Sequence, residues 1–313
     1  MKVWKKAATV AAMAGMTLAA LPVLAATAAV PIAPYGAIRA EWLAKGGASG
    51  FLGAPQNNEY TISAIPGDQV PPGARAEDFT GGVIYWSPAT GAHEAHGAIL
   101  QEYVAVGGTA VYGLPLTDEV TAPDGVGRFN HFSAGGSIYW TPLGGAHAVH
   151  GGIKADWVAL GYEHSVVGYP TSDEYDVPGV PGARMQYFAG GDIFWSGPTG
   201  AHEVHGLILF EYANTLGGAQ TYGLPTTDET TAPDRVGRFN HFSNGGSIYW
   251  TPVTGAHEVH GAIREAWAGT GYEHGPLGYP TTDEFGMAGG RGGDFQHGYI
   301  WWTATGGTVV HVN

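Results

Sequence analysis

Apolar and polar positions recur along this chain in a fixed order, which favours a short helix followed by aromatic strands. Each helical segment opens near a glycine and carries an isoleucine followed four residues later by an aromatic residue. The pairs are Ile38/Trp42, Ile99/Tyr103, Ile153/Trp157, Ile208/Tyr212 and Ile263/Trp267. Because residues i and i+4 lie on one face of a helix, we expect five amphipathic helices of about two to three turns. Helices of this length are marginal alone, so they must pack against the strands that follow.

A Gly-x-Pro turn and an acidic pair separate each predicted helix from its strands. Proline fixes its own φ and glycine tolerates positive φ, so this element predicts a rigid corner. The first repeat carries Asn58-Glu59 after the turn, and the others carry Asp118-Glu119, Asp173-Glu174, Asp228-Glu229 and Asp283-Glu284.

Two aromatic-rich strands joined by a glycine turn follow each corner and predict a β-hairpin. The clearest example runs from Arg128 to Ser133 and from Ser137 to Pro142. Side chains alternate along a strand, so one residue of the Ile-Tyr-Trp stretch at 138–140 faces away from the other two. A Gly-Ala-His segment after a second turn predicts a third short strand. Each repeat is therefore predicted to be a three-stranded meander plus a helix.

The period of this pattern predicts a repeat protein. The turn glycines are Gly53, Gly113, Gly168, Gly223 and Gly278, which gives spacings of 60, 55, 55 and 55 residues. We place the repeats at residues 35–96, 97–150, 151–205, 206–260 and 261–313, in a single domain spanning 35–313. The predicted fold is β-rich α+β. Little chain remains for polar end caps, so we expect the five repeats to close into a five-fold pseudosymmetric, propeller-like ring.

The amino-terminal segment predicts export. Lys2, Lys5 and Lys6 precede an uncharged run at residues 7–21 that ends in small residues, as in a secretory signal peptide, which we place at residues 1–28. The run is shorter than the roughly 20 residues that span a membrane. We therefore expect a secreted, extracellular protein without a membrane span, and association with the cell wall is compatible with this location.

Charge and composition narrow the possible partners. The chain has 13 basic and 27 acidic residues, a formal net charge of −14, which disfavours nucleic acid as a partner. It has no cysteine, so its stability must come from packing even in a compartment that permits disulfides. The 10 Trp, 16 Tyr and 11 Phe residues supply the apolar surface that an ordered, turn-rich β protein needs.

The stretches Leu277-Gly-Tyr-Pro-Thr-Thr-Asp-Glu284 and Gly246-Ser-Ile-Tyr-Trp-Thr-Pro-Val-Thr-Gly-Ala-His-Glu-Val-His-Gly261 resemble the LGFP repeat family. This family occurs in secreted and cell-envelope proteins of actinobacteria, including the C-terminal domains of some mycoloyltransferases. The resemblance implies a five-fold pseudosymmetric domain that holds proteins on envelope polysaccharide such as arabinogalactan or peptidoglycan. The chain departs from the pattern at Ala54 and Asn58, which replace an aromatic residue and an aspartate, and at Gly307-Thr308, where the last repeat lacks the Gly-Ala-His segment.

The strand tryptophans are the first candidates for carbohydrate contact, because a flat ring packs on the C–H face of a sugar while nearby polar groups bind its hydroxyls. They equally suit the core of each repeat. The candidates are Trp86, Trp140, Trp195 and Trp250. Possible polar partners, which could instead satisfy backbone groups between repeats, are Arg128, Asn130, His131, Arg238, Asn240 and His241, with Arg75 and Arg184 in the alternate repeats.

The histidines and acidic pairs allow several roles. The His-x-x-His pairs suggest a metal site, but residues three apart on an extended strand face opposite sides and cannot chelate one ion. Structural hydrogen bonding and contact with a ligand both remain open, and the candidates for contact are His93, His147, His202 and His257. The aspartates of the acidic pairs either hold the corner by hydrogen bonds or bind sugar hydroxyls. They are Asp118, Asp173, Asp228 and Asp283.

Nothing in the sequence supports an enzyme. A Gly-x-Ser-x-Gly elbow and a cysteine nucleophile are both missing, and the glycine-rich runs lack the context of a phosphate loop. Glycan hydrolysis by the acidic pairs is a weaker hypothesis, because a catalytic centre is usually single whereas these pairs recur. We expect no cofactor and no metal. The leading hypothesis is a non-catalytic, lectin-like domain for cell-envelope polysaccharide, and the alternative is an adaptor that binds another secreted protein.

Overall fold

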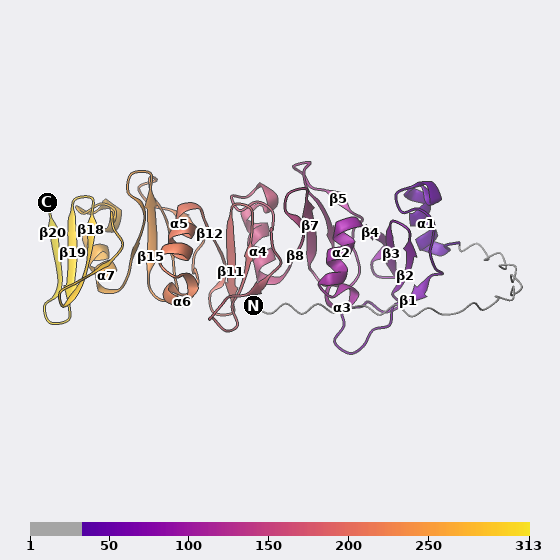
Figure 1. The fold of residues 1–313 in the computed structure, drawn as a ribbon, viewed down its shortest axis with the longest axis horizontal. Coiled ribbons are helices and arrows are strands. Elements are labelled where there is room, and N and C mark those ends of the chain that lie inside the picture. The colour runs from indigo at the N-terminus through magenta and orange to yellow at the C-terminus, as the bar shows by residue number, and fades with distance from the viewer. Residues whose placement is uncertain (1–32) are drawn as a thin grey trace, which may run out of the picture. The chain divides into compact units, whose positions relative to one another are not determined.

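The computed structural model describes residues 33–313, and these residues contain five copies of one helix-plus-sheet unit (Figure 1). The predicted signal peptide at residues 1–28 lies outside the described residues. Every unit begins with a helix that starts at a glycine, as the Ile-x-x-x-aromatic spacing predicted. These helices are α1 (Gly36–Ala44), α2 (Gly97–Ala105), α4 (Gly151–Leu160), α5 (Gly206–Phe210) and α7 (Gly261–Thr270).

A second helical turn follows each main helix, and the sequence analysis did not anticipate it. In the second and fourth repeats it is a short α-helix, α3 (Gly108–Tyr112) and α6 (Gly218–Tyr222). In the other repeats it is a single 3₁₀ turn, namely η1 (Gly47–Ser49), η2 (Tyr162–His164) and η4 (Tyr272–His274). In the fourth repeat α5 continues into a π-helical turn, η3 (Glu211–Thr215). These turns give the paired repeats their two alternating forms.

Each unit contains an antiparallel sheet of four strands in chain order, so the prediction of three strands was one strand short. The missed strand has only two or three residues and follows the acidic pair. The first sheet consists of β1 (Tyr60–Thr61), β2 (Arg75–Phe79), β3 (Gly82–Ser87) and β4 (Gly91–His96). The second consists of β5 (Val120–Thr121), β6 (Arg128–His131), β7 (Ser137–Thr141) and β8 (Gly145–Val149). The third consists of β9 (Tyr175–Asp176), β10 (Arg184–Tyr187), β11 (Gly191–Ser196) and β12 (Gly200–His205). The fourth consists of β13 (Thr230–Thr231), β14 (Arg238–His241), β15 (Ser247–Thr251) and β16 (Gly255–Val259). The fifth consists of β17 (Phe285–Met287), β18 (Gly290–Phe295), β19 (Gly298–Thr303) and β20 (Gly307–Val312).

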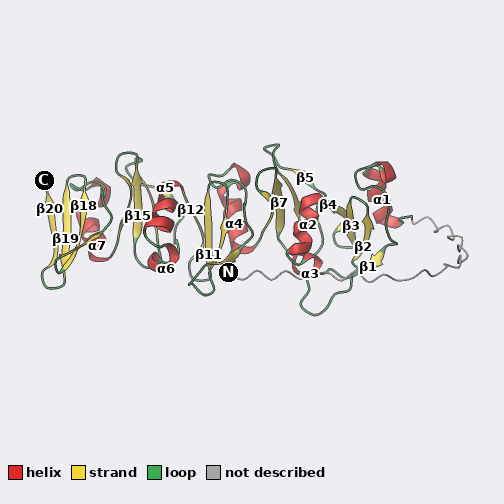
Figure 2. Ribbon diagram, viewed as in Figure 1, coloured by secondary structure: helices red, strands yellow, loops and turns green. Residues whose placement is uncertain are grey.

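The two faces of a sheet pack on two different helices, as the alternation in the third strand predicted. In the second repeat Ile138 packs with Ile99 and Tyr103 of its own helix. Tyr139 points the other way, and its ring meets Trp157 of the following helix edge-to-face at a centroid distance of 4.8 Å. Helices and sheets therefore alternate along the described residues (Figure 2).

The aromatic residue of the helix also fixes the Gly-x-Pro corner. The indole Nε1–H of Trp157 donates to the carbonyl of Gly168 at 2.8 Å, and Trp42 and Trp267 make the same bond to Gly53 and Gly278 at 2.8 and 3.0 Å. Trp157 and Trp267 are fully buried, so each ring contributes packing and a satisfied polar group at the same point. The helix, corner and sheet of a repeat are thus one packed unit.

Closure into a ring, which the lack of end caps predicted, is not found among residues 33–313. Tyr85, Tyr139, Phe194 and Tyr249 of the first four sheets are buried by the following helix, whereas their counterpart in the fifth sheet, Trp301, is 38% exposed. The outer face of the last sheet is therefore open. No helix within residues 33–313 has the length and apolar character that crossing a membrane requires.

Candidate functional site

A pocket between the first turn of the main helix and the sheet recurs from repeat to repeat. In the fifth repeat His260, Glu284, Arg291 and Trp302 line it together with the residues that start α7. The second repeat places His96, Glu119, Arg128 and Trp140 in the same way. The corresponding sets are Tyr35, Glu59, Arg75 and Trp86 in the first repeat and His205, Glu229, Arg238 and Trp250 in the fourth. The pocket volumes are about 210 Å³ in the fifth repeat, 310 Å³ in the second, 380 Å³ in the first and 590 Å³ in the fourth.

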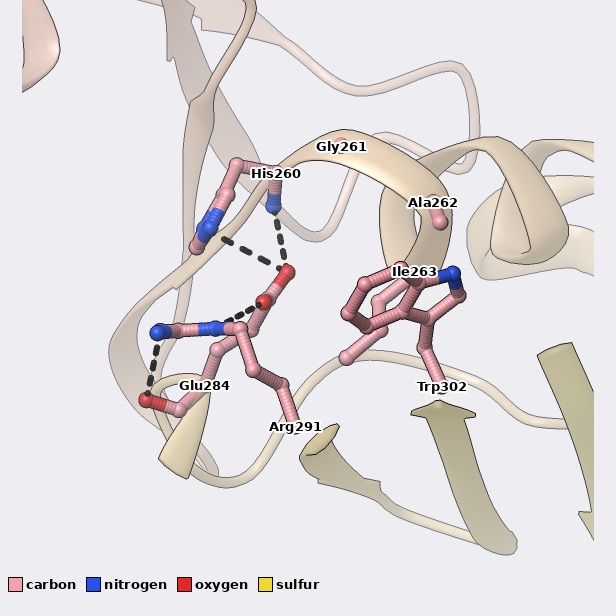
Figure 3. Close-up of a pocket in the computed structure, with 7 residues that line it drawn as sticks. All are labelled: His260, Gly261, Ala262, Ile263, Glu284, Arg291 and Trp302. Atoms are coloured by element: carbon pink, nitrogen blue, oxygen red, sulfur yellow. Dashed lines mark hydrogen bonds and ion pairs between the residues drawn. The ribbon is translucent and has the colours of Figure 1, made fainter. Parts of the chain in front are cut away.

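Figure 3 shows how the side chains of the fifth pocket are arranged. The indole of Trp302 lies beside Ile263 and forms one wall, while Glu284, Arg291 and His260 form the opposite, polar wall. Arg291 Nε donates to Glu284 Oε2 at 3.1 Å, and the backbone N–H of His260 donates to Glu284 Oε1 at 2.8 Å. The glutamate therefore fixes both the guanidinium of Arg291 and the backbone at the start of α7.

A glutamate and an arginine form the same ion pair in every repeat. Glu59 and Arg75 are joined at 2.7 Å, Glu174 and Arg184 at 2.9 Å, and the other repeats pair Glu119 with Arg128 and Glu229 with Arg238. The glutamate side chain is at most 10% exposed, whereas the arginine side chain is between 31% and 44% exposed. A buried carboxylate thus fixes a guanidinium whose outer face remains accessible to a ligand.

A histidine completes the polar wall in four of the repeats. His96 Nδ1 lies 2.7 Å from Glu94 Oε2, and His260 Nδ1 lies 2.9 Å from Glu258 Oε2. This hydrogen bond raises the pKa of both imidazoles above the usual value, because the charged form is the better donor to a carboxylate. In the first repeat Tyr35 stands in this place, and its hydroxyl accepts from Arg75 at 2.9 Å.

The glycine that opens each main helix keeps the floor of the pocket free. Gly261 has φ of 49° and Gly97 has φ of 55°, a region that favours glycine, and a Cβ at either position would meet no atom within 4 Å. The third repeat differs at the next residue, since a Cβ on Gly152 would lie 2.3 Å from Trp195. Trp195 therefore occupies space that Ala98 and Ala262 fill in other repeats.

The structure brings some predicted site residues together in the pocket and separates others. Trp86, Trp140 and Trp250 line pockets beside Arg75, Arg128 and Arg238, and Trp195 lies in the matching place of the third repeat. These tryptophans are half-buried, so they belong both to the packing of a repeat and to an accessible wall.

Of the two roles predicted for Asn130 and Asn240, the structure shows the second, satisfying backbone groups between repeats, because both residues are fully buried. The side-chain amide of Asn130 donates to the carbonyls of Glu94 and Thr117 at 3.0 and 2.8 Å. Asn240 makes the same pair of bonds to Glu203 and Thr227 at 3.0 and 2.9 Å. Glu94 and Glu203 belong to the preceding repeat, so these amides join neighbouring repeats.

His131 and His241 also lie outside the pockets. His131 Nδ1 lies 2.6 Å from Ser137 Oγ, and the ring packs 4.8 Å from that of Phe129. Burial lowers the pKa of His241 to about 4, with Arg264 of the next helix adding to the effect. Both rings therefore face the following repeat as neutral packing groups.

The predicted His and Asp candidates lie together at the junctions between repeats. Asp118 Oδ1 of the second repeat lies 3.0 Å from His93 Nδ1 and accepts the backbone N–H of Glu94 at 3.4 Å. His202 and Asp228 are 3.0 Å apart, and His257 and Asp283 are 3.3 Å apart. His147 Nδ1 lies 3.5 Å from Asp173 Oδ1, which also accepts the N–H of Ala148. These residues cap the last strand of one sheet with the corner of the next repeat.

One group in the fifth repeat has the residue types of a metal site. Glu258, His260 and Glu284 offer ligand atoms within 4.8 Å of one another. Their oxygens already bind protein groups, because Glu258 Oε1 accepts the N–H of Glu284 at 3.1 Å and Arg291 pairs with Glu284. A cation would have to compete with the positive charge of Arg291, so this group acts as the polar wall of the pocket. The two histidines of each His-x-x-His pair point to different places, one to a junction and one to a pocket.

Three parts of the pocket were not predicted from the sequence: the glutamates, the second histidine of each pair and the start of the helix. The available signal was recurrence in all five repeats: the glutamate and the arginine are each present five times, whereas the aspartate and the Gly-Ala-His histidine are present four times. The three segments that meet in the pocket are far apart in the sequence, so recurrence alone does not show that they meet.

The comparisons agree with this repeat structure. A search of curated proteins gives no match. The family model of the LGFP repeat matches residues 52–110, 113–165, 167–219, 223–275 and 277–313. These five matches cover most of the chain, which therefore belongs to the LGFP repeat family.

Proposed function

We propose that the protein is an exported, non-catalytic carbohydrate-binding protein, and that each repeat offers one shallow sugar site in the pocket between helix and sheet. The observation that carries this proposal is the recurrence, in all five repeats, of a half-buried tryptophan together with a Glu–Arg pair whose guanidinium is accessible. The indole supplies an apolar wall for the C–H face of a sugar ring, and the guanidinium and imidazole bind hydroxyl groups.

A polymeric glycan of the cell envelope, such as arabinogalactan or peptidoglycan, is the proposed ligand. A single pocket of a few hundred Å³ that is open to solvent holds one sugar weakly. Several equivalent sites on one chain bind a polymer much more strongly, because the second contact becomes intramolecular. The repeated pocket argues for binding without turnover, since each glutamate is held by its arginine and the same set serves five places.

The test is sedimentation of the protein with purified arabinogalactan and with purified peptidoglycan, combined with calorimetry on oligosaccharides from the polymer that binds. Trp250→Ala removes the wall of the largest pocket, and we expect about tenfold weaker binding at that site, the factor that about 1.4 kcal/mol of lost apolar contact gives. Phe210→Ala is the matched control, because Phe210 lies in the same repeat and is 58% exposed outside the pocket. No retention by either polymer, or equal loss in both variants, would contradict the proposal.

A second candidate function, docking of another secreted protein, is favoured by an apolar groove of about 490 Å³ between the second and third repeats. Val126, Leu143 and Tyr169 line it, and the side chain of Leu143 is fully exposed. Exposed apolar patches of this kind often mark protein contacts. Affinity purification from culture medium would separate the two functions, because a stoichiometric protein favours docking and release by free glycan favours carbohydrate binding.

A further inference from the structure

Within residues 33–313, no helix covers the outer face of the fifth sheet as the following helix covers each of the other sheets. Tyr85, Tyr139, Phe194 and Tyr249 are between 3% and 7% exposed beneath the following helix. Trp301 stands at the equivalent place and is 38% exposed, and Val309 on the neighbouring strand is 54% exposed. Burying an exposed aromatic ring is favourable because it removes apolar area from water, so the open face is a ready contact surface.

The free edge of the same sheet is also uncapped. In the first sheet the backbone N–H of Glu94 donates to Asp118, and its carbonyl accepts from Asn130, both from the next repeat. Val310 is paired with Ile300 in the same register as Glu94 with Ile84, and it is 39% exposed. An exposed apolar edge strand is a template for association with another chain.

Helix α1 of the first repeat resembles the helices that cover the outer faces of the other sheets, but it covers no sheet in this way itself within the described part of the chain. Trp157 and Trp267 are fully buried because each helix lies between two sheets. Within residues 33–313 no sheet precedes α1, and Trp42 stays partly exposed. Lys154 reaches back to the carbonyl of Gly135 at 2.7 Å, and Arg264 reaches back to Ser247 Oγ at 2.7 Å. Arg39 occupies the same helix position in α1 and is exposed.

The charges of the two ends are complementary. Burial, together with the charge of Lys154 or Arg264, lowers the pKa of His131 and His241. Arg264 Nε and His241 Nδ1 both bond Ser247 Oγ, so the cation lies beside this strand position of the preceding sheet. In the fifth sheet this strand position is Asp294, next to Phe295 as His241 is next to Phe242. Among residues 33–313 the Asp294 carboxylate has no cationic partner, so a docked α1 would bring Arg39 to an unpaired aspartate.

The residues at the two ends that correspond to the internal junctions differ from the internal ones in a matching way. Each internal junction joins a helix carboxylate, a strand histidine and the aspartate of the next repeat, such as Glu211, His257 and Asp283. At the ends the three equivalent positions are Ala266, Val309 and Asn58, none of which is charged. A junction between the last and first repeats would therefore leave no unpaired carboxylate or histidine at this point.

We propose that the outer face of the fifth sheet binds the first repeat of a second copy of this chain, with α1 covering Trp301, Asn58 capping β20 and Arg39 pairing with Asp294. The interface continues the one that joins successive repeats within the chain. The occupant is a second copy, because the α1 of the same chain leaves this face exposed. Such a head-to-tail contact uses different surfaces on the two partners, so it extends by adding further copies.

Sedimentation equilibrium of the purified protein over a wide concentration range tests the proposal. We expect an average mass that rises with concentration, and about tenfold weaker association for Arg39→Glu and for Asp294→Arg, since each places like charges together. The double variant Arg39→Glu/Asp294→Arg restores the pair with reversed sign and should recover the association. Glu265→Arg reverses an exposed charge on α7 and should leave it unchanged. Thermal unfolding of every variant checks that the fold is kept.

Three results would overturn the proposal. One is a monomeric mass at all concentrations, and another is association that the single reversals do not weaken. The third is a monomer in which the two reversals are nevertheless coupled in thermal stability, because that result would place α1 on the fifth sheet of its own chain.

Discussion

One residue in the first turn of the main helix decides how far the pocket tryptophan can approach. Ala98 and Ala262 hold Trp140 and Trp302 away from the helix, and open pockets result. Gly152 has no Cβ, and Trp195 moves into the space that a methyl group would fill. In the third repeat the indole therefore lies against the first turn of the helix.

Gly152→Ala should move the indole of Trp195 outward to the place that its counterparts occupy. The new Cβ would lie 2.3 Å from Trp195, so the ring must shift. We expect more quenching of tryptophan fluorescence by acrylamide, a shifted indole N–H resonance, and a loss of about 1 kcal/mol in unfolding free energy, the lower end of overpacking costs, because other repeats accept an alanine here.

Gly269→Ala is the control for this substitution. Gly269 lies inside α7 and a Cβ there meets no atom within 4 Å, so alanine should raise the unfolding free energy by about 0.5 to 1 kcal/mol. The Trp195 resonance should not change. An unshifted Trp195 in Gly152→Ala would show that the helix backbone, and not the ring, gives way.

At the scale of elements, the junctions between repeats depend on carboxylates that are partly buried. Asp156 of α4 lies near His202, Glu203 and Asp228, and its Oδ2 is buried without a hydrogen-bond partner within the described residues. Burial, with repulsion from Asp228, raises the pKa of Asp156 to about 7. Burial and the neighbouring aspartate also raise the pKa of Glu102 and Glu211 at their junctions. The helix carboxyl groups therefore pack best when protonated.

Asp156→Asn should stabilise the protein at alkaline pH. A raised pKa means that the contribution of Asp156 is fully present below its unfolded value near 4 and is lost as the pH rises through about 7. The amide cannot ionise. We therefore expect the free energy of unfolding of the variant to differ little from that of the parent at pH 4 and to exceed it by at least about 1 kcal/mol at pH 8, since one pKa unit corresponds to about 1.4 kcal/mol. Thermal or denaturant unfolding at both pH values measures this difference. Glu265→Gln, an exposed carboxylate of α7, should show the same stability as the parent at both pH values. A stabilisation of Asp156→Asn that does not depend on pH would contradict this account.

The main elements follow from local patterns, which explains what the sequence could predict. The Ile-x-x-x-aromatic spacing gives the helices, and alternation around Tyr139 gives the two faces of a sheet, because both are properties of neighbouring residues. The two-residue strand at Val120–Thr121 is too short to produce a periodic signal. The wall formed by Glu119, Arg128 and His96 joins three distant segments, so it needs the tertiary structure. The sequence could not decide between the two roles left open for Asn130, because an amide that bridges two repeats looks, in sequence, like any polar residue of a strand.

At the scale of the whole molecule, the repeats divide two tasks between different residues. The junction residues, such as Asp118 and Asn130, satisfy the backbone of the preceding sheet and so join the repeats. The pocket residues, such as Arg128 and Trp140, keep accessible surface that these joints do not need. A change in a pocket can therefore alter ligand binding while the joints stay intact.

This separation predicts how binding should depend on the number of intact pockets. We expect successive removal of Trp140, Trp250 and Trp302 by alanine to weaken binding to polysaccharide steeply, because linked sites together gain about 10²- to 10⁴-fold over a single site. Affinity for a short oligosaccharide that fills one pocket should stay nearly constant while the number of bound molecules falls. Calorimetry on the two ligands measures both quantities. Equal loss of affinity for polymer and oligosaccharide would show instead that one repeat supplies the binding and that the others only support it.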